Sequence, residues 1–376
     1  MALIAATYGL ARFGYGLFLP QLSEAFGLAP AVSGAVQAGS FLSYCLAALL
    51  ASRLGSRPRL VVLLAGATAA VGSVGVAAAP GAAVLAVSVV VAGAGAGFAT
   101  PGLVSLVARN VAPARQETAQ TVVNAGTGAG IVVAGLILFL TLGQWRLGWL
   151  AIAAITALAT AASLRADRAP RTSRAAAERP RVGRDDLGRL ARPLAAAVLA
   201  GASSAAVWTF GRSVMAASGG GDDGSIVAWM VLGGCGVLGA VAGPLVQAWS
   251  LRVAWVVTTG AMTVPTVVLG LVPSGPPAFV AVAVFGASYT AMSGILIVWA
   301  VRVLPDRAAG GTVVLFIALA LGQAAGSAAL GALLGAASAG PTFAVAGLLG
   351  TVAVLTVLGR RRVAVPTRPA GSAAGR

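Results

Sequence analysis

Charged side chains are scarce in this chain, and so are the residue types that most often carry out chemistry. Only 9% of the 376 residues are charged, against about 25% in an ordinary soluble domain. Histidine and lysine are absent, acidic residues number nine, and the two cysteines, Cys45 and Cys235, each lie inside an apolar run. The lack of histidine removes the commonest general base and metal ligand. Two such cysteines do not indicate a disulfide framework. An enzyme, a metal site and a cofactor are therefore not expected.

Long apolar runs fill the chain instead, and hydrophobic residues make up 59% of it. A soluble protein of this composition would have too little polar surface to cover its core, whereas lipid allows an apolar exterior. A helix needs about 20 apolar residues to cross the hydrocarbon core, and it pairs its backbone groups internally. The sequence predicts an all-α membrane protein with twelve such helices. They are expected near 3–22, 31–52, 60–79, 83–108, 117–140, 146–164, 192–215, 225–248, 253–272, 278–301, 311–335 and 341–359.

The basic charge comes entirely from 25 arginines, and the net charge is +16. Such a balance can indicate a nucleic-acid partner. None is expected here, because the arginines lie in short loops between apolar runs and form no stripe with aromatic residues. With the N-terminus inside, 22 arginines fall in cytoplasmic loops, linker and tail, and only Arg146 falls outside. Because arginine-rich loops stay in the cytoplasm, this predicts a multi-pass protein of the inner (plasma) membrane with both termini cytoplasmic.

One long polar stretch divides the chain near its middle. Residues 165–191 are rich in arginine and poor in large apolar residues. They predict a cytoplasmic linker, with a short surface helix near 185–191, between an N-terminal six-helix bundle at 1–164 and a C-terminal six-helix bundle at 192–359. A basic cytoplasmic tail follows at 360–376.

The two predicted bundles resemble each other. The loops that end at Arg115 and Arg307 both contain an arginine, then a proline, one residue and a second arginine. Glycines recur with identical spacing in the fifth and eleventh predicted helices, at Gly126, Gly130, Gly135, Gly322, Gly326 and Gly331. Glycine at four-residue spacing lets membrane helices approach closely, so these six are expected to pack helices together. Repeated six-helix units are one known plan of secondary transporters.

A family resemblance rests on the loop after the second predicted helix. This loop carries Arg53, Gly55 and Arg57, which match the pattern Gly-x-x-x-Asp-Arg-x-Gly-x-Arg of the major facilitator superfamily (MFS). Ala48 and Ser52 replace the glycine and the aspartate of that pattern. With the repeat and the central linker, the chain resembles an MFS transporter over its whole length.

The first helix reads Gly-Leu-Ala-Arg-Phe-Gly-Tyr at 9–15, followed by Leu-Pro at 19–20, and is similar to the YbfB/YjiJ-like branch of that family. The resemblance implies two bundles related by pseudo-two-fold symmetry that rock around a central cavity, in a monomer that moves a small-molecule substrate across the bilayer. It also implies a gating role for Arg53, Gly55 and Arg57, although Ser52 cannot supply the carboxylate that latches the cytoplasmic side in the family.

Two arginines lie inside predicted membrane helices, where a charge costs about 2.5–3.5 kcal/mol on insertion scales. Arg12 is near the middle of the first helix, and Arg212 is toward the outer end of the seventh. Helical spacing places Tyr8 and Tyr15 on one face with Arg12, and Trp208 on one face with Arg212. Each half thus offers an arginine beside aromatic residues, which suits a small anion. The structural alternative is a guanidinium that bonds to helix carbonyls or snorkels to the surface.

Further polar side chains inside the predicted spans are candidates to line the same cavity. They are Gln37, Asn124, Tyr289 and Gln323. No acid is predicted at mid-membrane, and Asp222 and Asp223 are assigned to an outer loop. The favoured function is therefore transport of a small organic anion, by exchange, by facilitated diffusion or together with a proton that the substrate carries.

The main alternative is proton-driven efflux of drugs or other apolar compounds. Gly126, Gly130 and Gly135 partly resemble the antiporter motif Gly-x-x-x-Gly-Pro-x-x-Gly-Gly, which favours efflux, whereas the missing membrane acid disfavours it. A membrane enzyme would need positioned acids, bases or metal ligands, which the sequence does not offer. A receptor without flux has the same sequence features as a transporter.

Overall fold

The computed structural model describes residues 1–141, 144–168, 182–241 and 249–358, and all regular structure within them is helical. The first helix of the chain is made of three consecutive pieces, α1 (Ala2–Ile4), η1 (Ala5–Arg12) and α2 (Phe13–Phe26). The N-terminal half continues with α3 (Pro30–Arg53), α4 (Pro58–Ala78), α5 (Ala82–Asn110), α6 (Pro113–Leu140) and α7 (Trp145–Ala166). Three of these helices begin at a proline, whose fixed φ and missing N–H suit the first helical position.

The C-terminal half also opens with a composite helix. It consists of α8 (Arg184–Ala205), η2 (Ala206–Gly211), α9 (Arg212–Met215) and η3 (Ala216–Gly220). It continues with α10 (Gly221–Val241), α12 (Leu251–Leu271), α13 (Gly275–Val303), η4 (Pro305–Arg307), α14 (Ala308–Ala336) and α15 (Ala339–Leu355). Residues 184–191, assigned to the linker from the sequence, form the first two turns of α8. Most of that linker and the tail at 360–376 lie outside the described residues.

Ten helices within the described residues are long and apolar enough to cross a membrane. The shorter apolar helix α15 and helix α10 complete the order of twelve predicted spans. The prediction of an all-α membrane protein with the twelve-helix arrangement is therefore confirmed. The loops at 54–57, 111–112 and 304–307 share one end of the molecule, here called the arginine-rich end, and the loops at 27–29 and 79–81 lie at the opposite end.

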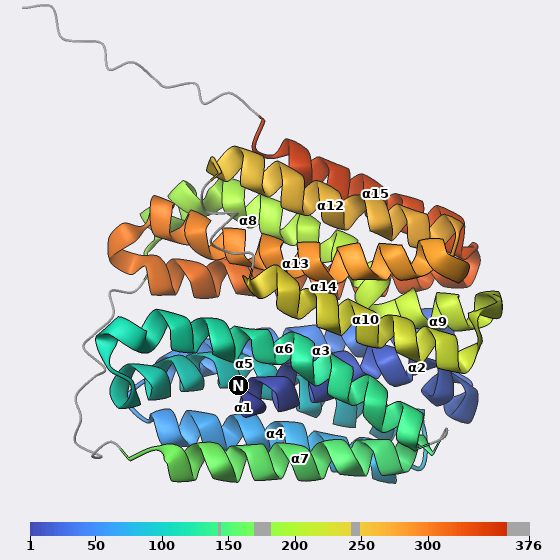
Figure 1. Cartoon of the computed structure of the whole chain (residues 1–376), viewed down its shortest axis with the longest axis horizontal. Coiled ribbons are helices and arrows are strands. Elements are labelled where there is room, and N and C mark those ends of the chain that lie inside the picture. Colours follow the sequence, from blue (N-terminus) through green and yellow to red (C-terminus); the bar gives the residue numbers. More distant parts are fainter. Residues whose placement is uncertain (142–143, 169–181, 242–248, 359–376) are drawn as a thin grey trace, which may run out of the picture.

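The two halves form two layers of helices, one above the other in Figure 1. Two pairs of helices pack closely across the boundary between the layers, α3 with α14 and α6 with α10. Backbone meets backbone at these contacts near the opposite end, where a Cβ added to Gly34 would lie 2.2 Å from the carbonyl oxygen of Ser327. This boundary holds the side chains of the candidate site.

The backbone departs from α-helix at equivalent places in the two halves. The first helix is π-helical over η1, which ends at Arg12, and the seventh is π-helical over η2, which ends one residue before Arg212. Segments of π-helix are rare and frequently lie at functional sites. They also change the angular step between residues, so side chains on either side of a segment no longer share the face that α-helical spacing predicts.

The repeated glycines make equivalent contacts in the two halves. Gly130 of α6 lies against Ala5 of the first helix, and Gly326 of α14 lies against Ala202 of the seventh. In both cases an added Cβ would come within 2.5 Å of the neighbouring backbone, at 2.3 Å from Ala5 and 2.5 Å from Ala202. Gly126 and Gly322 repeat this arrangement against Met1 and Val198, while Gly135 and Gly331 face the other half.

Replacing Gly326 by valine is expected to destabilise the protein by about 1–3 kcal/mol, because the new side chain overlaps the backbone of α8. The measurement is thermal unfolding of the purified protein in detergent. Gly335→Val is the matched control, since Gly335 is on the same helix and has open space around its Cα. Equal melting temperatures for the two variants would contradict a packing role for Gly326.

Candidate functional site

Arg12 lies at the end of η1 with only 5% of its surface exposed. Its Nη2 donates a hydrogen bond to Oε1 of Gln323 on α14, over 3.1 Å, so the contact joins the two halves. Its Nε is buried and has no hydrogen-bond partner among the described residues. No carboxylate in the described part of the chain forms an ion pair with it. The guanidinium is therefore a buried cation without a counter-charge from the residues that the structure describes.

Aromatic rings surround this guanidinium in place of acids. Its central carbon lies 4.2 Å from the ring centroid of Tyr44 and 4.9 Å from that of Phe41, both on α3. The rings of Tyr8 and Phe13 follow, each at 5.4 Å. Each such contact stabilises a cation by about 0.5–2 kcal/mol. The rings thus offset part of the cost of burying the charge, and they leave its hydrogen-bonding capacity largely unused.

A chain of hydroxyl and amide groups extends from Arg12 along the boundary between the halves. Nε2 of Gln323 donates to the hydroxyl of Tyr289 on α13 over 3.1 Å. On the other side, the hydroxyl of Tyr8 lies 2.8 Å from Oγ1 of Thr100 on α5 and donates to the hydroxyl of Tyr44 over 3.3 Å. Tyr8, Thr100 and Tyr289 are only partly buried, so these three members of the cluster keep some exposed surface.

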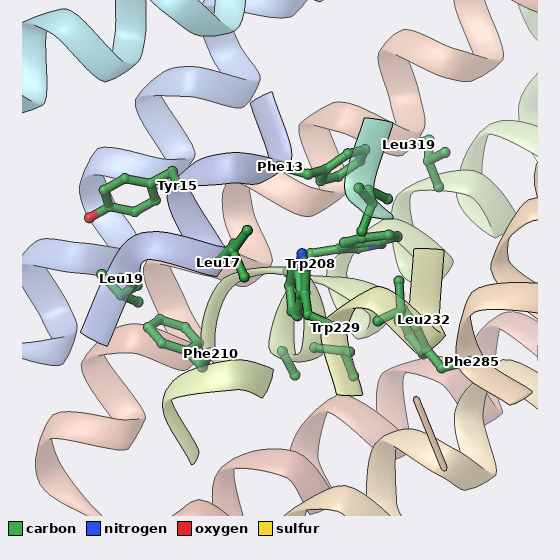
Figure 2. Close-up of a cluster of buried hydrophobic side chains, with 14 of the residues drawn as sticks. Phe13, Tyr15, Leu17, Leu19, Trp208, Phe210, Trp229, Leu232, Phe285 and Leu319 are labelled. Carbon is green, nitrogen blue, oxygen red and sulfur yellow. The ribbon is translucent and has the colours of Figure 1, made fainter. Parts of the chain in front are cut away.

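Trp208 closes one wall of the cluster. Its ring stacks on Phe13 of the N-terminal half with centroids 4.1 Å apart and meets Tyr289 edge-on at 5.1 Å. Figure 2 shows Phe13 and Trp208, one from each half, close together, with Tyr15 well to one side. The indole Nε1 of Trp208 and both amide atoms of the fully buried Gln37 are unpaired among the described residues. The helices near the boundary therefore hold buried donors and acceptors whose hydrogen bonds the described residues do not supply.

Other predicted site residues lie apart from this cluster. Tyr15 is fully buried and donates to the backbone oxygen of Ser33 over 3.3 Å. Asn124 is exposed on α6. The structure brings together Arg12, Tyr8, Trp208, Tyr289 and Gln323. It adds four residues that sequence reasoning missed, which are Phe13, Phe41, Tyr44 and Thr100.

Arg212 belongs to a separate cluster toward the opposite end. It is fully buried, and its Nη1 donates to the carbonyl oxygen of Leu17 over 2.5 Å and to Oε1 of Gln21 over 2.7 Å. Its Nη2 forms an ion pair with Asp222 over 2.5 Å, and Gln21 also donates to that carboxylate over 2.7 Å. Asp222, which the sequence assigned to an outer loop, is thus in the first turn of α10. We call Gln21, Arg212 and Asp222 the latch, because they join the halves.

Comparison with known proteins decides the family. The sequence model of the Major Facilitator Superfamily matches residues 1–327, which is most of the chain. The chain belongs to the Major Facilitator Superfamily. It is therefore a multi-pass membrane transporter, and the family resemblance inferred from the loop motif is confirmed. A search of curated protein sequences finds no match to this MFS chain.

Solved structures of transporters share the fold of this MFS protein at low sequence identity. The nucleoside transporter NupG is 13% identical with a TM-score of 0.76, and the alignment covers 95% of this chain and 96% of NupG. The xylose transporter XylE from E. coli, in a partially occluded inward open conformation, is 13% identical with a TM-score of 0.75, covering 95% of both chains. A bacterial homolog of the human lysosomal transporter Spinster is 16% identical with a TM-score of 0.72, covering 95% of this chain and 92% of that one. These likenesses establish the fold.

The MFS loop motif lies at the arginine-rich end, between α3 and α4. Ser52, Arg53, Gly55 and Arg57 are all exposed, and the hydroxyl of Ser52 donates to the backbone oxygen of Leu49 over 2.6 Å. Neither arginine of the motif forms an ion pair within the described residues. The loop therefore takes part in no charge network among the described residues.

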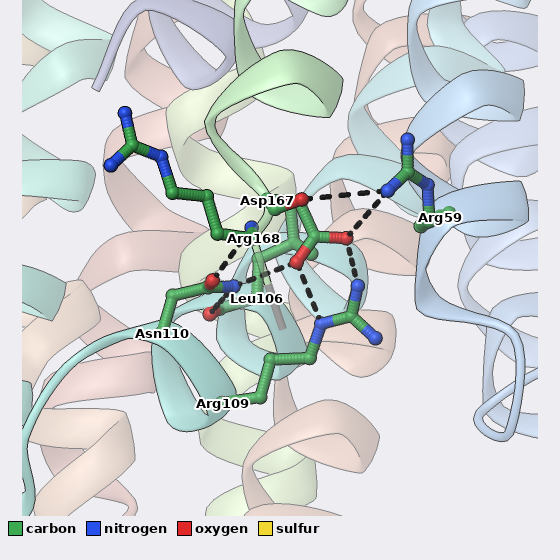
Figure 3. A network of polar contacts seen from close by, with 6 residues as sticks. All are labelled: Arg59, Leu106, Arg109, Asn110, Asp167 and Arg168. Carbon is green, nitrogen blue, oxygen red and sulfur yellow. Dashed lines mark hydrogen bonds and ion pairs between the residues drawn. The ribbon is translucent and has the colours of Figure 1, made fainter. Parts of the chain in front are cut away.

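A different acid organises the arginine-rich end of this MFS chain. Asp167, directly after α7, has a fully buried carboxylate that pairs with Arg109 and, over 3.5 Å, with Arg59. Asn110 donates to it over 2.8 Å. Figure 3 shows how these side chains converge from α4 and α5 on one carboxylate. Sequence reasoning counted Asp167 as part of the linker; an acid directly after a membrane helix, opposite two arginine-bearing loops, is the signal that predicts such a network.

Proposed function

We propose that this MFS protein moves a small organic anion across the plasma membrane by alternating access, and that Arg12 binds the anion. The observation that carries the proposal is a guanidinium with 5% exposure and no acidic partner in the described part of the chain. Leaving a buried charge uncompensated costs several kcal/mol. Such an arrangement is maintained where a ligand of opposite charge supplies the missing partner.

The position of Arg12 supports a transport role rather than a purely structural one. A structural arginine inside a membrane helix satisfies its donors with carbonyls or acids of the same protein. Arg212 does so through Leu17 and Asp222, whereas Arg12 has one hydrogen bond to a side-chain amide of the other half. The Gln323 contact forms between halves that move relative to each other in this family. Anion binding and the contact between halves are thereby coupled at one residue.

The orientation belongs to the same proposal. Both termini and the arginine-rich end face the cytoplasm, as the distribution of arginines in the loops favours. The close backbone contacts of α3 with α14 and the latch then seal the outer side. The first-helix motif around Arg12 supports assignment to the YbfB/YjiJ-like branch of the superfamily. Transport as a monomer follows the pattern of the family.

The aromatic wall favours a second candidate, efflux of apolar or aromatic compounds. Phe13, Trp208 and Tyr289 offer ring faces and edges to a flat apolar solute. This candidate leaves the charge of Arg12 without a function, because an apolar solute gains nothing from a guanidinium. We therefore place it second.

A counterflow assay separates these candidates and also excludes a receptor without flux. Liposomes that contain the purified protein are loaded with one unlabelled compound, and a trace of the same compound, labelled, is added outside. The panel contains small aliphatic and aromatic carboxylates, their neutral amides, and lipophilic cations. We expect accumulation of at least one carboxylate and none of its amide, because the amide cannot neutralise Arg12. Accumulation of cations or amides alone would contradict anion transport.

A further inference from the structure

A second arginine cluster lies far from Arg12, at the arginine-rich end of the C-terminal half. A cavity of about 610 Å³ opens there between the start of α8, the start of α12, and the ends of α13 and α15. Three arginines line it, Arg189 and Arg192 from α8 and Arg252 from α12. This cavity plays no part in the site described above.

Part of the lining of the cavity is apolar. Trp299 of α13 forms it together with Leu251 and Val357. The ring of Trp299 packs edge-on against Trp255 with centroids 5.3 Å apart, and the indole of Trp255 donates to the backbone oxygen of Ala353 over 2.9 Å. These contacts fix α12, α13 and α15 relative to one another, so the cavity keeps its shape.

The charges around the cavity favour an anionic occupant. Arg189 and Arg252 are exposed and have no ion pair among the described residues. The buried acid on the first turn of α8, Asp186, is already bound by Arg307 and by the backbone N–H of Gly183. The chain that follows Val357 carries five arginines and no acid. Charge repulsion therefore disfavours this tail as the occupant.

The depth of the cavity favours a lipid over a soluble anion. The four helices begin or end at the cavity, which places it where membrane helices leave the hydrocarbon, and tryptophan is enriched at that level. Exposed apolar side chains lie next to the lining residues in the sequence. Val253 follows Arg252 and is 47% exposed, and Leu355 lies two residues before Val357 and is 52% exposed. A lipid phosphate can meet the arginines while its acyl chains lie along these side chains.

We propose that this cavity binds the headgroup of an anionic glycerophospholipid, with Arg189, Arg192 and Arg252 around the phosphate and Trp299 beneath the glycerol. Basic pockets between membrane helices on the cytoplasmic side are the general setting for such sites. The bound lipid bridges α8 to α12 and α15 and thereby stabilises the C-terminal half. The site is independent of the substrate that the transporter moves.

The test uses the purified full chain and two lipids of equal chain length, phosphatidylglycerol and phosphatidylcholine. Native mass spectrometry counts retained lipids, and thermal unfolding measures the stabilisation that each lipid gives. We expect phosphatidylglycerol to bind preferentially, and each arginine-to-glutamine change to weaken it about fivefold, or about a hundredfold for all three. The matched control is the triple variant Arg53→Gln, Arg165→Gln and Arg168→Gln, which removes three exposed arginines at the same end of the other half. It is expected to bind like the original chain.

Two further experiments show whether the bound anion is a lipid or a soluble phosphate, and keep the test valid if the triple variant does not fold. Glycerol 3-phosphate displaces the lipid if the cavity selects a soluble phosphate, and that result would overturn the lipid assignment. The single variants Arg189→Gln and Arg252→Gln provide graded losses if the triple variant does not fold. Equal phosphatidylglycerol retention by the cavity variants and by the control would overturn the proposal altogether.

Discussion

Replacing Arg12 by alanine is expected to reduce anion counterflow about a hundredfold, while the protein stays as stable as before or becomes more stable. Truncating one partner of a buried charged hydrogen bond costs about 2–5 kcal/mol of binding, and every 1.4 kcal/mol is tenfold. The stability follows from the same geometry. Arg12 is buried beside rings and one amide, without an acid in the described part of the chain, so its removal relieves an uncompensated charge.

The combined measurement separates binding from a structural role. Counterflow of the accepted anion is compared with thermal unfolding for Arg12→Ala, Arg12→Lys and Gln323→Ala. Lysine keeps the charge but loses the planar fork, so an intermediate loss is expected. Arg165→Ala, at the exposed end of α7, serves as the control with unchanged flux. Full transport by Arg12→Ala, or parallel loss of flux and stability, would remove the basis of the proposed function.

The helical architecture was largely predictable from composition and periodicity. Apolar runs of membrane length and short arginine-bearing loops predicted the helix order, and the fold confirms it. The glycine repeat likewise predicted that the fifth and eleventh helices pack closely through these positions, although not which helices they meet. Only a residue without a side chain fits where an added Cβ would lie 2.5 Å from a neighbouring backbone. Apolar runs and glycine spacing are properties of single segments, so they predict helices and their packing positions without knowledge of which distant segments meet.

The composition of the site was predictable only in part. Arg12 and Gln323 stood out as polar residues inside apolar spans, but they are 311 residues apart, and no spacing rule predicts that they meet. Phe41 and Tyr44 are cation–π partners of Arg12 only because of where the fold places them. Their residue type does not reveal this, since aromatic side chains are common in membrane helices. The hydroxyl of Tyr44 within a span was the one usable sign.

The π-helical segment η2 accounts for one of the two places where helical spacing and the structure disagree about which side chains share a face. An α-helical period places Tyr15 with Arg12 and Trp208 with Arg212. In the structure η2 contains Trp208 and ends one residue before Arg212, and Trp208 joins the Arg12 cluster. Tyr15 follows η1 in regular α-helix and donates to Ser33, whereas Tyr8, inside η1, stays beside Arg12. A sequence with no proline at these points gives no sign of the switch. The latch was missed because Asp222 follows a run of glycines, and such a sequence resembles a solvated loop.

Replacing Asp222 by alanine is expected to shift the protein toward conformations that are open at the opposite end. The change leaves the fully buried Arg212 without its counter-charge, while Leu17 and Gln21 still hold it. The side chain of Asp222 is 54% exposed, which screens the ion pair, so we expect a cost of about 1–3 kcal/mol rather than that of a fully buried pair. This corresponds to a change of roughly 5- to 150-fold in the ratio of closed to open molecules.

Spin labels across the opposite end measure this shift directly. Cysteines at Ala29 and Ser338, both exposed, report the separation of the halves once Cys45 and Cys235 are replaced by alanine. The distance distribution is expected to gain a long component in Asp222→Ala and in Arg212→Gln. Asp223→Ala removes the same charge from the neighbouring exposed position and is expected to leave the distribution unchanged. If the contact between α3 and α14 alone keeps this end closed, all variants will give the same distances, and that result would contradict a role for the latch in closure. Arg212 binds Gln21 of α2 and Asp222 of α10 at the same time. If these contacts control opening, the loss of the one carboxylate of Asp222 therefore allows the two halves to separate at this end.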